Sequence, residues 1–295
     1  RKQNMENVKS DEWQAKEEDI KHMKEWLKKQ VHLPQNIPDE QLIQFLYSCY
    51  SKLEVAKRAI DTYYTMKTTT PEFFSNRHLD APGLKHITEV VQMCILPGRT
   101  HSGYSVLWAR LLDCDSSKFY LDDAIKLLFM LVDTCLARDR TSAKGMVIVF
   151  DNKGNSLGHL ARLTLASTKK YFIYVQEAMP VRLKCILIVN VNSVMTHIMN
   201  LIKPFIHKDY VKYILLHNPD QIQKTYSIVP REIQPKDYGG EAPSMDTLSR
   251  ETLKQIRSHA DWFKFDETLR IIESKKPLKN NNCYLEGSFK KLNID

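Results

Sequence analysis

Apolar residues recur at helical spacing through the first quarter of the chain, with polar residues between them. Three helices are predicted there, and their apolar stripes are Ile20, Met23 and Leu27; Leu42, Phe45, Leu46 and Cys49; and Leu53, Ala56, Ile60 and Tyr63. Ser10 and Asp11 can cap the first helix, Pro38 suits the start of the second, and Pro71 ends the third. The pattern predicts a small helical bundle over residues 1–74, whose expected role is packing.

After this bundle the pattern changes to strands that alternate with helices. Short apolar runs predict strands at residues 105–112, 145–151 and 185–191, and helical spacing predicts helices at residues 121–136 and 157–178. Strands separated by helices favour βαβ units with parallel pairing. We therefore expect an α/β domain over residues 75–245. The remaining segment, residues 246–295, begins with a predicted helix at residues 247–262.

Composition narrows the class of protein. The chain has 295 residues, 43% of them hydrophobic and 26% charged, so it is globular and long enough for one large domain or two. Its six cysteines form no C-x-x-C pair, and most lie in apolar runs, which is typical of reduced, buried thiols. No apolar run reaches the roughly 18 residues of a membrane span, and the polar N-terminus is unlike a secretory signal. We expect a soluble cytoplasmic protein.

The net charge of +8 favours anionic partners. Nucleic acid is not expected, because the aromatic residues form no RNA-binding signature and no zinc-finger spacing occurs. Phosphoinositide headgroups and acidic proteins remain as candidate anionic partners. A solvated basic surface without a specific partner is an equally good interpretation of the charge. No metal ligands and no cofactor are predicted.

One motif is typical of a hydrolase. Residues 154–158 read Gly-Asn-Ser-Leu-Gly, which matches the nucleophile elbow G-x-S-x-G between a strand and a helix, with Ser156 as the nucleophile. The other residue types of a triad follow in order, as Asp209 or Asp246 and His217 or His259. However, three residues separate the strand from Gly154, and the chain, with nine glycines, has no glycine-rich oxyanion loop upstream. We expect no catalytic residues and keep a serine hydrolase as a remote alternative.

The block from Lys144 to Gly240 resembles the CRAL-TRIO (Sec14-like) lipid-binding family, and within it the branch of the α-tocopherol transfer proteins and clavesins. The matching segments are Gly145-Met-Val-Ile-Val-Phe-Asp151 with Gly154 and His159; Pro180-Val-Arg-Leu-Lys184 and Ile186-Leu-Ile-Val-Asn190; Ile202-Lys-Pro-Phe205; and Asp237-Tyr-Gly-Gly240. The N-terminal helices match the family's small helical domain, and Glu286-Gly-Ser-Phe-Lys-Lys-Leu292 resembles the tail of that branch. The motifs are individually loose but specific in this order and spacing.

This resemblance implies an α/β domain whose mixed, largely parallel sheet floors an apolar cavity covered by a gate helix. It places Met146, Ile148 and Phe150 toward the cavity, and these alternate along their strand with Val147 and Val149. It adds further lining residues: Ile125, Leu128, Val132, Tyr171, Tyr174, Val175 and Ile186. The tyrosines matter most, because a buried hydroxyl needs a partner and can bind the polar end of a ligand. Packing without ligand contact is an equally good interpretation of each residue.

The matching gate spans residues 190–213. Its sequence supports this independently, because one apolar stripe at helical spacing lies opposite the polar residues His197, Asn200 and Lys203. The apolar gate residues are Val194, Met195, Ile198, Met199 and Ile202, followed by Phe205. Methionines suit a surface that adapts to varied ligands, and Pro204 can form a hinge. Ordinary core packing is the alternative.

In the resembling branch, basic residues near the gate couple ligand release to phosphoinositides. The resemblance places Arg182 and Lys184 at the first basic pair. At the second pair this chain has Asp209 and Tyr213, while Lys208 and Lys212 lie one residue earlier and share a helical face. Clustered Lys and Arg suit phosphate groups. The arginines that usually follow Phe-Leu in the helical domain are also missing after Phe45-Leu46.

The sequence thus favours a non-enzymatic carrier that holds one hydrophobic molecule, such as a tocopherol, retinoid, carotenoid or other lipid, in a closed cavity. It would deliver this ligand at membranes, associate with them peripherally with the help of phosphoinositides, and be a monomer. The second hypothesis is a phosphoinositide-binding trafficking adaptor whose cavity is vestigial, and the third is the hydrolase. Pattern alone does not name the ligand, because pocket volume and a few polar groups decide it.

Overall fold

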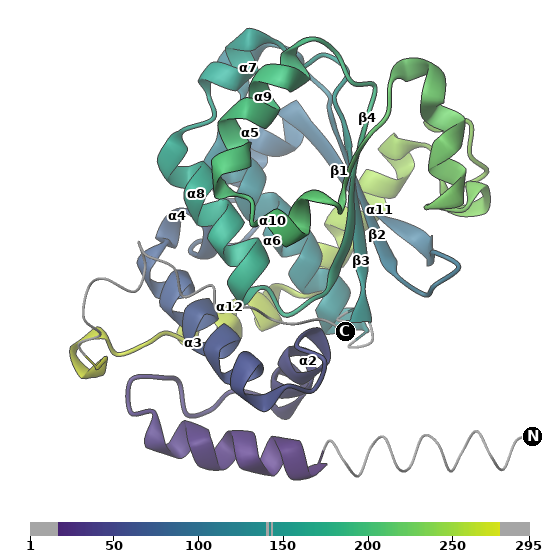
Figure 1. The fold of residues 1–295 in the computed structure, drawn as a ribbon. Coiled ribbons are helices and arrows are strands. Elements are labelled where there is room, and N and C mark those ends of the chain that lie inside the picture. Colours follow the sequence, from purple (N-terminus) through teal and green to yellow (C-terminus); the bar gives the residue numbers. More distant parts are fainter. Residues whose placement is uncertain (1–16, 140–141, 143, 278–295) are drawn as a thin grey trace, which may run out of the picture.

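A five-stranded sheet forms the centre of the molecule, and helices cover both of its faces (Figure 1). This computed structural model describes residues 17–139, 142 and 144–277. The N-terminal helices pack below the sheet in the view of Figure 1, close to the last helix of the chain. Among the described residues, no helix combines the length and hydrophobicity needed to cross a membrane.

The N-terminal helices follow the predicted apolar stripes. Residues 17–29 are helical, and α2 (Asp39–Ser48) and α3 (Leu53–Thr69) follow, which confirms the three predicted helices. All stripe residues are buried except Cys49 and Leu53, which are half-buried. Two shorter helices, α4 (Pro71–Phe74) and α5 (Pro82–Val90), each begin with a proline, whose fixed φ suits the first helical position. The predicted cap at Ser10 and Asp11 lies outside the described residues.

The strands lie side by side in chain order. They are β1 (Val91–Arg99), β2 (Ser105–Leu111), β3 (Met146–Asp151), β4 (Leu183–Val189) and β5 (Ile214–Leu216). β1 is antiparallel to β2 and all other neighbours are parallel, which confirms a mixed, largely parallel sheet. The sequence pattern did not predict β1 and β5. β1 follows α5 without a break and contains Pro97 and Gly98, and β5 has only three residues.

Two predicted helices are each divided in the structure. The prediction of one helix over residues 157–178 is wrong, because α7 (Leu157–Ala161), α8 (Leu165–Ile173) and a π-helical turn, η3 (Tyr174–Ala178), occupy this stretch. The Thr164 side chain accepts a hydrogen bond from the Ser167 N–H and so begins α8 as a separate helix. The helix predicted at residues 247–262 is likewise divided into α11 (Met245–Ser258) and α12 (Ala260–Thr268).

The remaining elements connect the strands. α6 (Leu121–Arg138) joins β2 to β3 and confirms the helix predicted there. Between β4 and β5 lie α9 (Val194–Ile202), the 3₁₀ turn η4 (Lys203–Phe205) and α10 (Lys208–Val211). The other 3₁₀ turns are η1 (Ser116–Lys118), η5 (Pro219–Ser227), η6 (Arg231–Ile233), η7 (Lys236–Tyr238) and η8 (Glu273–Lys275). The predicted tail motif at residues 286–292 lies outside the described residues.

Side chains alternate along β3 between two apolar cores, one on each face of the sheet. Met146 and Ile148 belong to a core that includes residues of α6 and of the N-terminal helices. Val147 and Val149 belong to a second core, which Met245 of α11 joins. Because the first core continues into the N-terminal helices, the helical bundle and the α/β domain share one interior.

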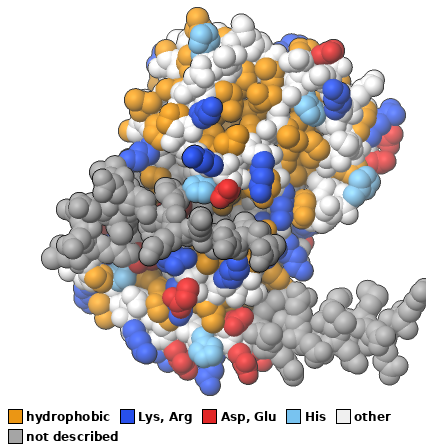
Figure 2. Space-filling view, viewed as in Figure 1, with side chains coloured by type: hydrophobic (Ala, Val, Ile, Leu, Met, Phe, Trp, Pro, Cys, Tyr) orange, Lys and Arg blue, Asp and Glu red, His pale blue; other side chains and the backbone are white. Residues whose placement is uncertain are grey.

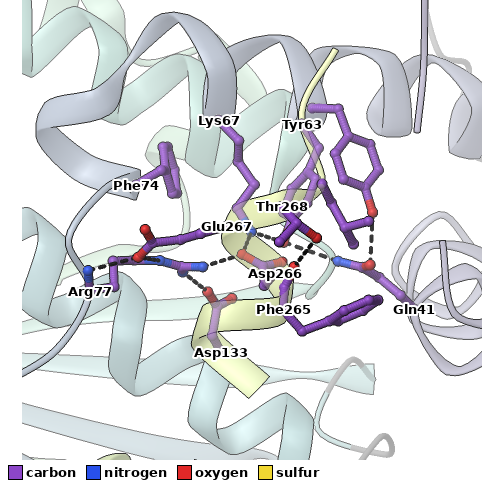
Figure 3. Close-up of polar contacts among 12 residues, drawn as sticks. Gln41, Tyr63, Lys67, Phe74, Arg77, Asp133, Phe265, Asp266, Glu267 and Thr268 are labelled. Carbon is purple, nitrogen blue, oxygen red and sulfur yellow. Dashed lines mark hydrogen bonds and ion pairs between the residues drawn. The ribbon is translucent and has the colours of Figure 1, made fainter. Parts of the chain in front are cut away.

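A network of buried charges joins four segments of the chain in this shared interior (Figure 3). Lys67 of α3 and Arg77 of the loop before α5 both hydrogen-bond with the Asp266 carboxylate of α12, and Arg77 also donates to Asp133 of α6 at 2.6 Å. Each of these side chains is at most 2% exposed. Removing one partner from such a pair leaves an uncompensated buried charge, which costs about 3–5 kcal/mol. The network therefore fixes the N-terminal helices and α12 on α6.

Candidate functional site

The sheet face beneath α6 and α8 brings the predicted lining residues together. Eight are buried in one apolar cluster: Ile125, Leu128 and Val132 of α6, Met146 and Ile148 of β3, Tyr174 and Val175 of η3, and Ile186 of β4. The other two, Phe150 and Tyr171, are half-buried and pack against the same cluster. Helical spacing in α6 and two-residue alternation in β3 direct these side chains to one side. Their contact with a ligand stays a prediction.

Aromatic rings form one wall of this apolar cluster. The Tyr174 ring centre lies 4.4 Å from that of Phe129 and 4.9 Å from that of Phe74. Tyr171 stacks on Phe129 with ring centres 5.8 Å apart and planes inclined by 4°. Sequence reasoning missed Phe74 and Phe129 as wall residues. Phe129 carried a signal, because it lies four residues after Ile125 and three before Val132 on the same helical face.

The two tyrosine hydroxyls in this wall have different surroundings. The hydroxyl of Tyr174 hydrogen-bonds with that of Tyr63, which also accepts from the Lys67 ammonium at 2.8 Å and from the Gln41 amide at 3.1 Å. Burial raises the pKa of both Tyr171 and Tyr174, so both phenols stay neutral. None of the hydrogen bonds between described residues involves the Tyr171 hydroxyl. Tyr174 is therefore committed to the buried network of Figure 3, whereas Tyr171 offers a donor to a ligand.

The predicted gate is a helix with few buried residues. α9 carries Val194, Met195, Ile198, Met199 and Ile202, and Phe205 ends η4. Of these only Met195 is buried, whereas the other five are half-buried, and Ile198 and Met199 pack against the apolar cluster. Pro204 lies in η4, directly after α9 ends, where the sequence predicted an interruption. The predicted gate helix α9 therefore packs on the cluster through a small set of apolar contacts, and its movement stays a prediction.

Hydrophobic side chains also gather on the outer surface near the gate. Figure 2 shows them over the part of the molecule that α9 occupies in Figure 1, with lysine and arginine side chains beside them. Leu157 at the start of α7 is 61% exposed, and Leu165 at the start of α8 is 59% exposed. Exposed apolar patches with polar rims are typical of surfaces that bind a protein or a membrane.

Amide side chains hold both ends of the gate. At its start, Asn192 accepts a hydrogen bond from the Asn152 amide at 2.9 Å and donates one to the Asn155 carbonyl at 3.0 Å. At its end, the Gln176 amide donates to the Phe205 carbonyl at 2.9 Å and accepts from the His207 N–H at 2.7 Å. No periodicity or motif in the sequence indicated these contacts.

The structure brings two of the four predicted basic residues into one site. Lys184 and Lys212 line a cavity of about 300 Å³ near the starts of β4 and β5. The turn between β1 and β2 contributes His101 and the hydroxyl residues Thr100, Ser102 and Tyr104, and Ser227 lies on another wall. None of the described residues that line this cavity is acidic. Two ammonium groups among hydroxyls, without a carboxylate, suit a phosphate group.

The other two basic residues lie elsewhere. The guanidinium carbon of Arg182 is 3.6 Å from the ring centre of Tyr50. Lys208 is exposed on α10 and does not line the cavity. A larger hollow of about 550 Å³ lies between residues 17–29 and α2, and charged side chains of both signs line most of it. That hollow is therefore unsuited to an apolar ligand.

Ser156 caps a helix. Its Oγ lies 2.9 Å from Nδ1 of His159, and its N–H donates to the same nitrogen at 3.2 Å, which forms a capping box at the start of α7. Gly154 has a φ of 83°, and a Cβ there would meet the Cys114 sulfur, so the turn itself requires this glycine. No hydrogen bond between described residues joins Ser156 to Asp209, Asp246, His217 or His259. The geometry favours a structural role for this serine.

Comparison with known proteins agrees with the fold and with the motifs. A family model described as CRAL/TRIO domain matches residues 90–240, which confirms the resemblance, and one described as Pinta-like, UBA domain matches residues 12–84. The chain is 27% identical to an alpha-tocopherol transfer protein-like protein of Mus musculus over 239 residues, which cover 81% of this chain and 68% of that relative. It is 22% identical to clavesin-1 of Rattus norvegicus over 208 residues, which cover 70% of this chain and 58% of that relative.

A solved structure shows the same fold. The crystal structure of Sfh5 superposes with a TM-score of 0.51 and 17% identity, over 80% of this chain and 91% of that chain. The α/β class expected from the sequence, with a helical N-terminal region and a mixed sheet, is thereby confirmed.

Proposed function

The chain belongs to the CRAL/TRIO domain family of lipid-binding and lipid-transfer proteins, and from that premise we propose that it is a non-enzymatic carrier of one hydrophobic molecule. The cargo is a tocopherol-, retinoid- or carotenoid-like lipid held between α6, β3, β4 and η3. One observation supports this best: all ten predicted lining residues converge on one apolar sheet face beneath a gate that is itself mostly half-buried.

The wall of the apolar cluster also indicates the polarity of the cargo. Two of the ten lining residues carry a hydroxyl, Tyr171 and Tyr174. The Tyr174 hydroxyl already hydrogen-bonds with Tyr63, so the Tyr171 hydroxyl is the one left to meet a ligand. Such a site favours a molecule with a long apolar body and one hydrogen-bonding group at its end, because burying further polar groups without partners costs free energy. We therefore infer a lipid with a single small polar end.

Lipid analysis tests this proposal directly. Organic extraction of the purified protein, followed by mass spectrometry, is expected to yield one lipid per chain. Ile148→Phe reduces lipid content, because the larger side chain fills the ligand's space. Val149→Phe is the matched control, since Val149 lies one residue along β3 and faces the opposite core. An extract without lipid, from protein that also takes up none from vesicles, contradicts the proposal.

We further propose that the cavity of Lys184 and Lys212 receives the phosphate of a phosphoinositide headgroup and that this contact aids gate opening at a membrane. The absence of acidic residues among its described lining residues supports an anionic ligand. The protein then associates with membranes peripherally and transiently. This arrangement also keeps the adaptor hypothesis open, because the cavity is separate from the apolar cluster. An adaptor would bind phosphoinositide vesicles equally well with and without Ile148→Phe, and would carry no lipid.

A further inference from the structure

The π-helical turn η3 connects the apolar cluster to the gate. Tyr174 and Val175 are buried in the cluster, whereas the next residue, Gln176, contacts the gate. A π-helical turn inserts an extra residue into a helix and redirects the side chains that follow, and such turns occur frequently at functional sites. Neighbouring residues of one turn thus contact the candidate ligand space and its cover.

Gln176 meets two backbone groups on either side of Ile206. Its Nε2 donates to the Phe205 carbonyl at 2.9 Å and to the Phe172 carbonyl at 3.0 Å, and its Oε1 accepts from the His207 N–H at 2.7 Å. Only one orientation of the amide satisfies all three groups, because the reverse orientation sets donor against donor and acceptor against acceptor. One side chain therefore ties the junction between η4 and α10 to α8 and η3.

Different side chains hold the two ends of the gate. Around its start, Asn190 donates to the Asp151 carboxylate at 2.8 Å, in addition to the two contacts of Asn192 with the loop before α7. In the described part of the chain, no hydrogen bond links the side chains of α9 to another element. At the far end, the Gln176 side chain bonds the backbone of Phe205 and His207, and the Tyr210 hydroxyl donates to the Gln176 carbonyl at 3.4 Å. Loss of the Gln176 side chain removes two of these contacts and loosens that end, while the contacts at the start stay.

From this geometry we propose that Gln176 is the positioning residue that keeps the gate closed, with the asparagine-held start as its pivot. The proposal rests on the proposed carrier function, in which α9 moves to release the ligand. Because Val175 and Gln176 are adjacent, filling or emptying the apolar cluster acts on the same turn that holds the gate. The occupancy of the cluster thereby sets how firmly the gate is closed.

Hydrogen–deuterium exchange of the protein without added ligand tests this contact, with Gln176→Ala and Gln176→Glu as variants. Both variants remove the donor to Phe205, and exchange at residues 203–211 is expected to rise about fivefold, since a hydrogen bond contributes roughly 1 kcal/mol. Exchange in β3 and β4 stays unchanged. Gln255→Ala is the matched control, because this half-buried residue on α11 contacts Arg138, far from the gate in sequence. Unchanged exchange at residues 203–211, or an equal rise throughout the sheet, overturns the proposal.

A second measurement tests whether the contact of Gln176 with the gate affects lipid transfer. Protein preloaded with a nitrobenzoxadiazole-labelled tocopherol is mixed with phosphatidylcholine vesicles, and the Gln176 variants are expected to release the probe about fivefold faster than wild type and Gln255→Ala. Equal release rates overturn the coupling between gate and cargo. If wild type takes up no lipid probe of any class, the carrier function fails, while the exchange experiment still decides whether Gln176 holds the gate.

Discussion

The Tyr50 ring lies 3.6 Å from the guanidinium carbon of Arg182, and its hydroxyl accepts a hydrogen bond from Lys184 at 3.2 Å. Tyr50 and Ser51 both have positive φ angles, 55° and 57°, so the connection between α2 and α3 bends sharply and carries this ring to the start of β4. A tyrosine of the N-terminal bundle thus holds the basic pair that the family resemblance assigns to phosphoinositides.

Tyr50→Ala is expected to strengthen binding to phosphoinositide vesicles by about threefold, because it releases Arg182 from a cation–π contact worth roughly 0.5–1 kcal/mol at an exposed site. Vesicle co-sedimentation measures the change. Tyr50→Phe keeps the ring and serves as the control, with affinity close to that of wild type. Weaker binding of Tyr50→Ala would mean that the ring itself takes part in headgroup contact.

Two of the predicted lysines, Lys184 and Lys212, line the cavity, whereas Lys208 does not. Lys184→Ala and Lys212→Ala are each expected to weaken binding to phosphoinositide vesicles by about fivefold, since a lysine near an anionic surface contributes roughly 1 kcal/mol. Lys208→Ala is the matched control, because Lys208 is exposed on the same segment but does not line the cavity. Equal losses for all three lysines would point to a diffuse basic surface instead of a site.

Local sequence patterns were sufficient for much of the fold. Periodic apolar positions indicated which face of each element is buried. Examples are the helical stripe of Ile20, Met23 and Leu27 and the strand alternation of Met146 and Ile148. The breaks at Thr164 and His259 were missed because apolar spacing continues across them, and a single capping side chain decided the first.

The contacts that organise the candidate site are long-range and were not predictable in this way. Lys67 and Asp266 are 199 positions apart in the chain, and no spacing relates them. In the sequence, Gln176 is an ordinary polar position of a predicted helix. In the structure, the π-helical turn directs its side chain to Phe205. The motif match put Asp209 and Tyr213 at the second basic pair, so it did not foresee that Lys212 lines a cavity with Lys184. Nor could it foresee that Tyr50 engages Arg182.

The buried lysine of the network predicts a specific pH dependence of stability. Burial lowers the pKa of Lys67 to about 8, although Asp266 opposes the shift. An unfolded lysine has a pKa of about 10.4. Between these values the unfolded chain binds more protons at this position than the folded chain, so the contribution of Lys67 to stability increases with pH. The unfolding free energy of wild type minus that of Lys67→Met should therefore increase from about pH 8 to pH 10 in urea titrations.

An exposed lysine controls for general charge effects on this measurement. Lys264 on α12 has a side chain that is 79% exposed, so the difference between wild type and Lys264→Met should not vary over the same pH interval. A pH-independent difference for Lys67→Met would show that the network keeps this lysine at its ordinary pKa.

The two tyrosines in the aromatic wall of the apolar cluster allow binding and stability to be separated. Tyr171→Phe removes a hydroxyl that hydrogen-bonds with no described residue, so its unfolding free energy should stay within about 0.5 kcal/mol of wild type. Affinity for the co-purified lipid should fall about two- to tenfold, because a ligand hydrogen bond contributes roughly 0.5–1.5 kcal/mol.

Tyr174→Phe should behave in the opposite way. Its hydroxyl pairs with Tyr63 inside the buried network, so the protein loses about 1 kcal/mol of stability while lipid affinity changes little. If both variants lose affinity equally, the cargo's polar end lies between the two hydroxyls, and the assignment to Tyr171 alone is wrong.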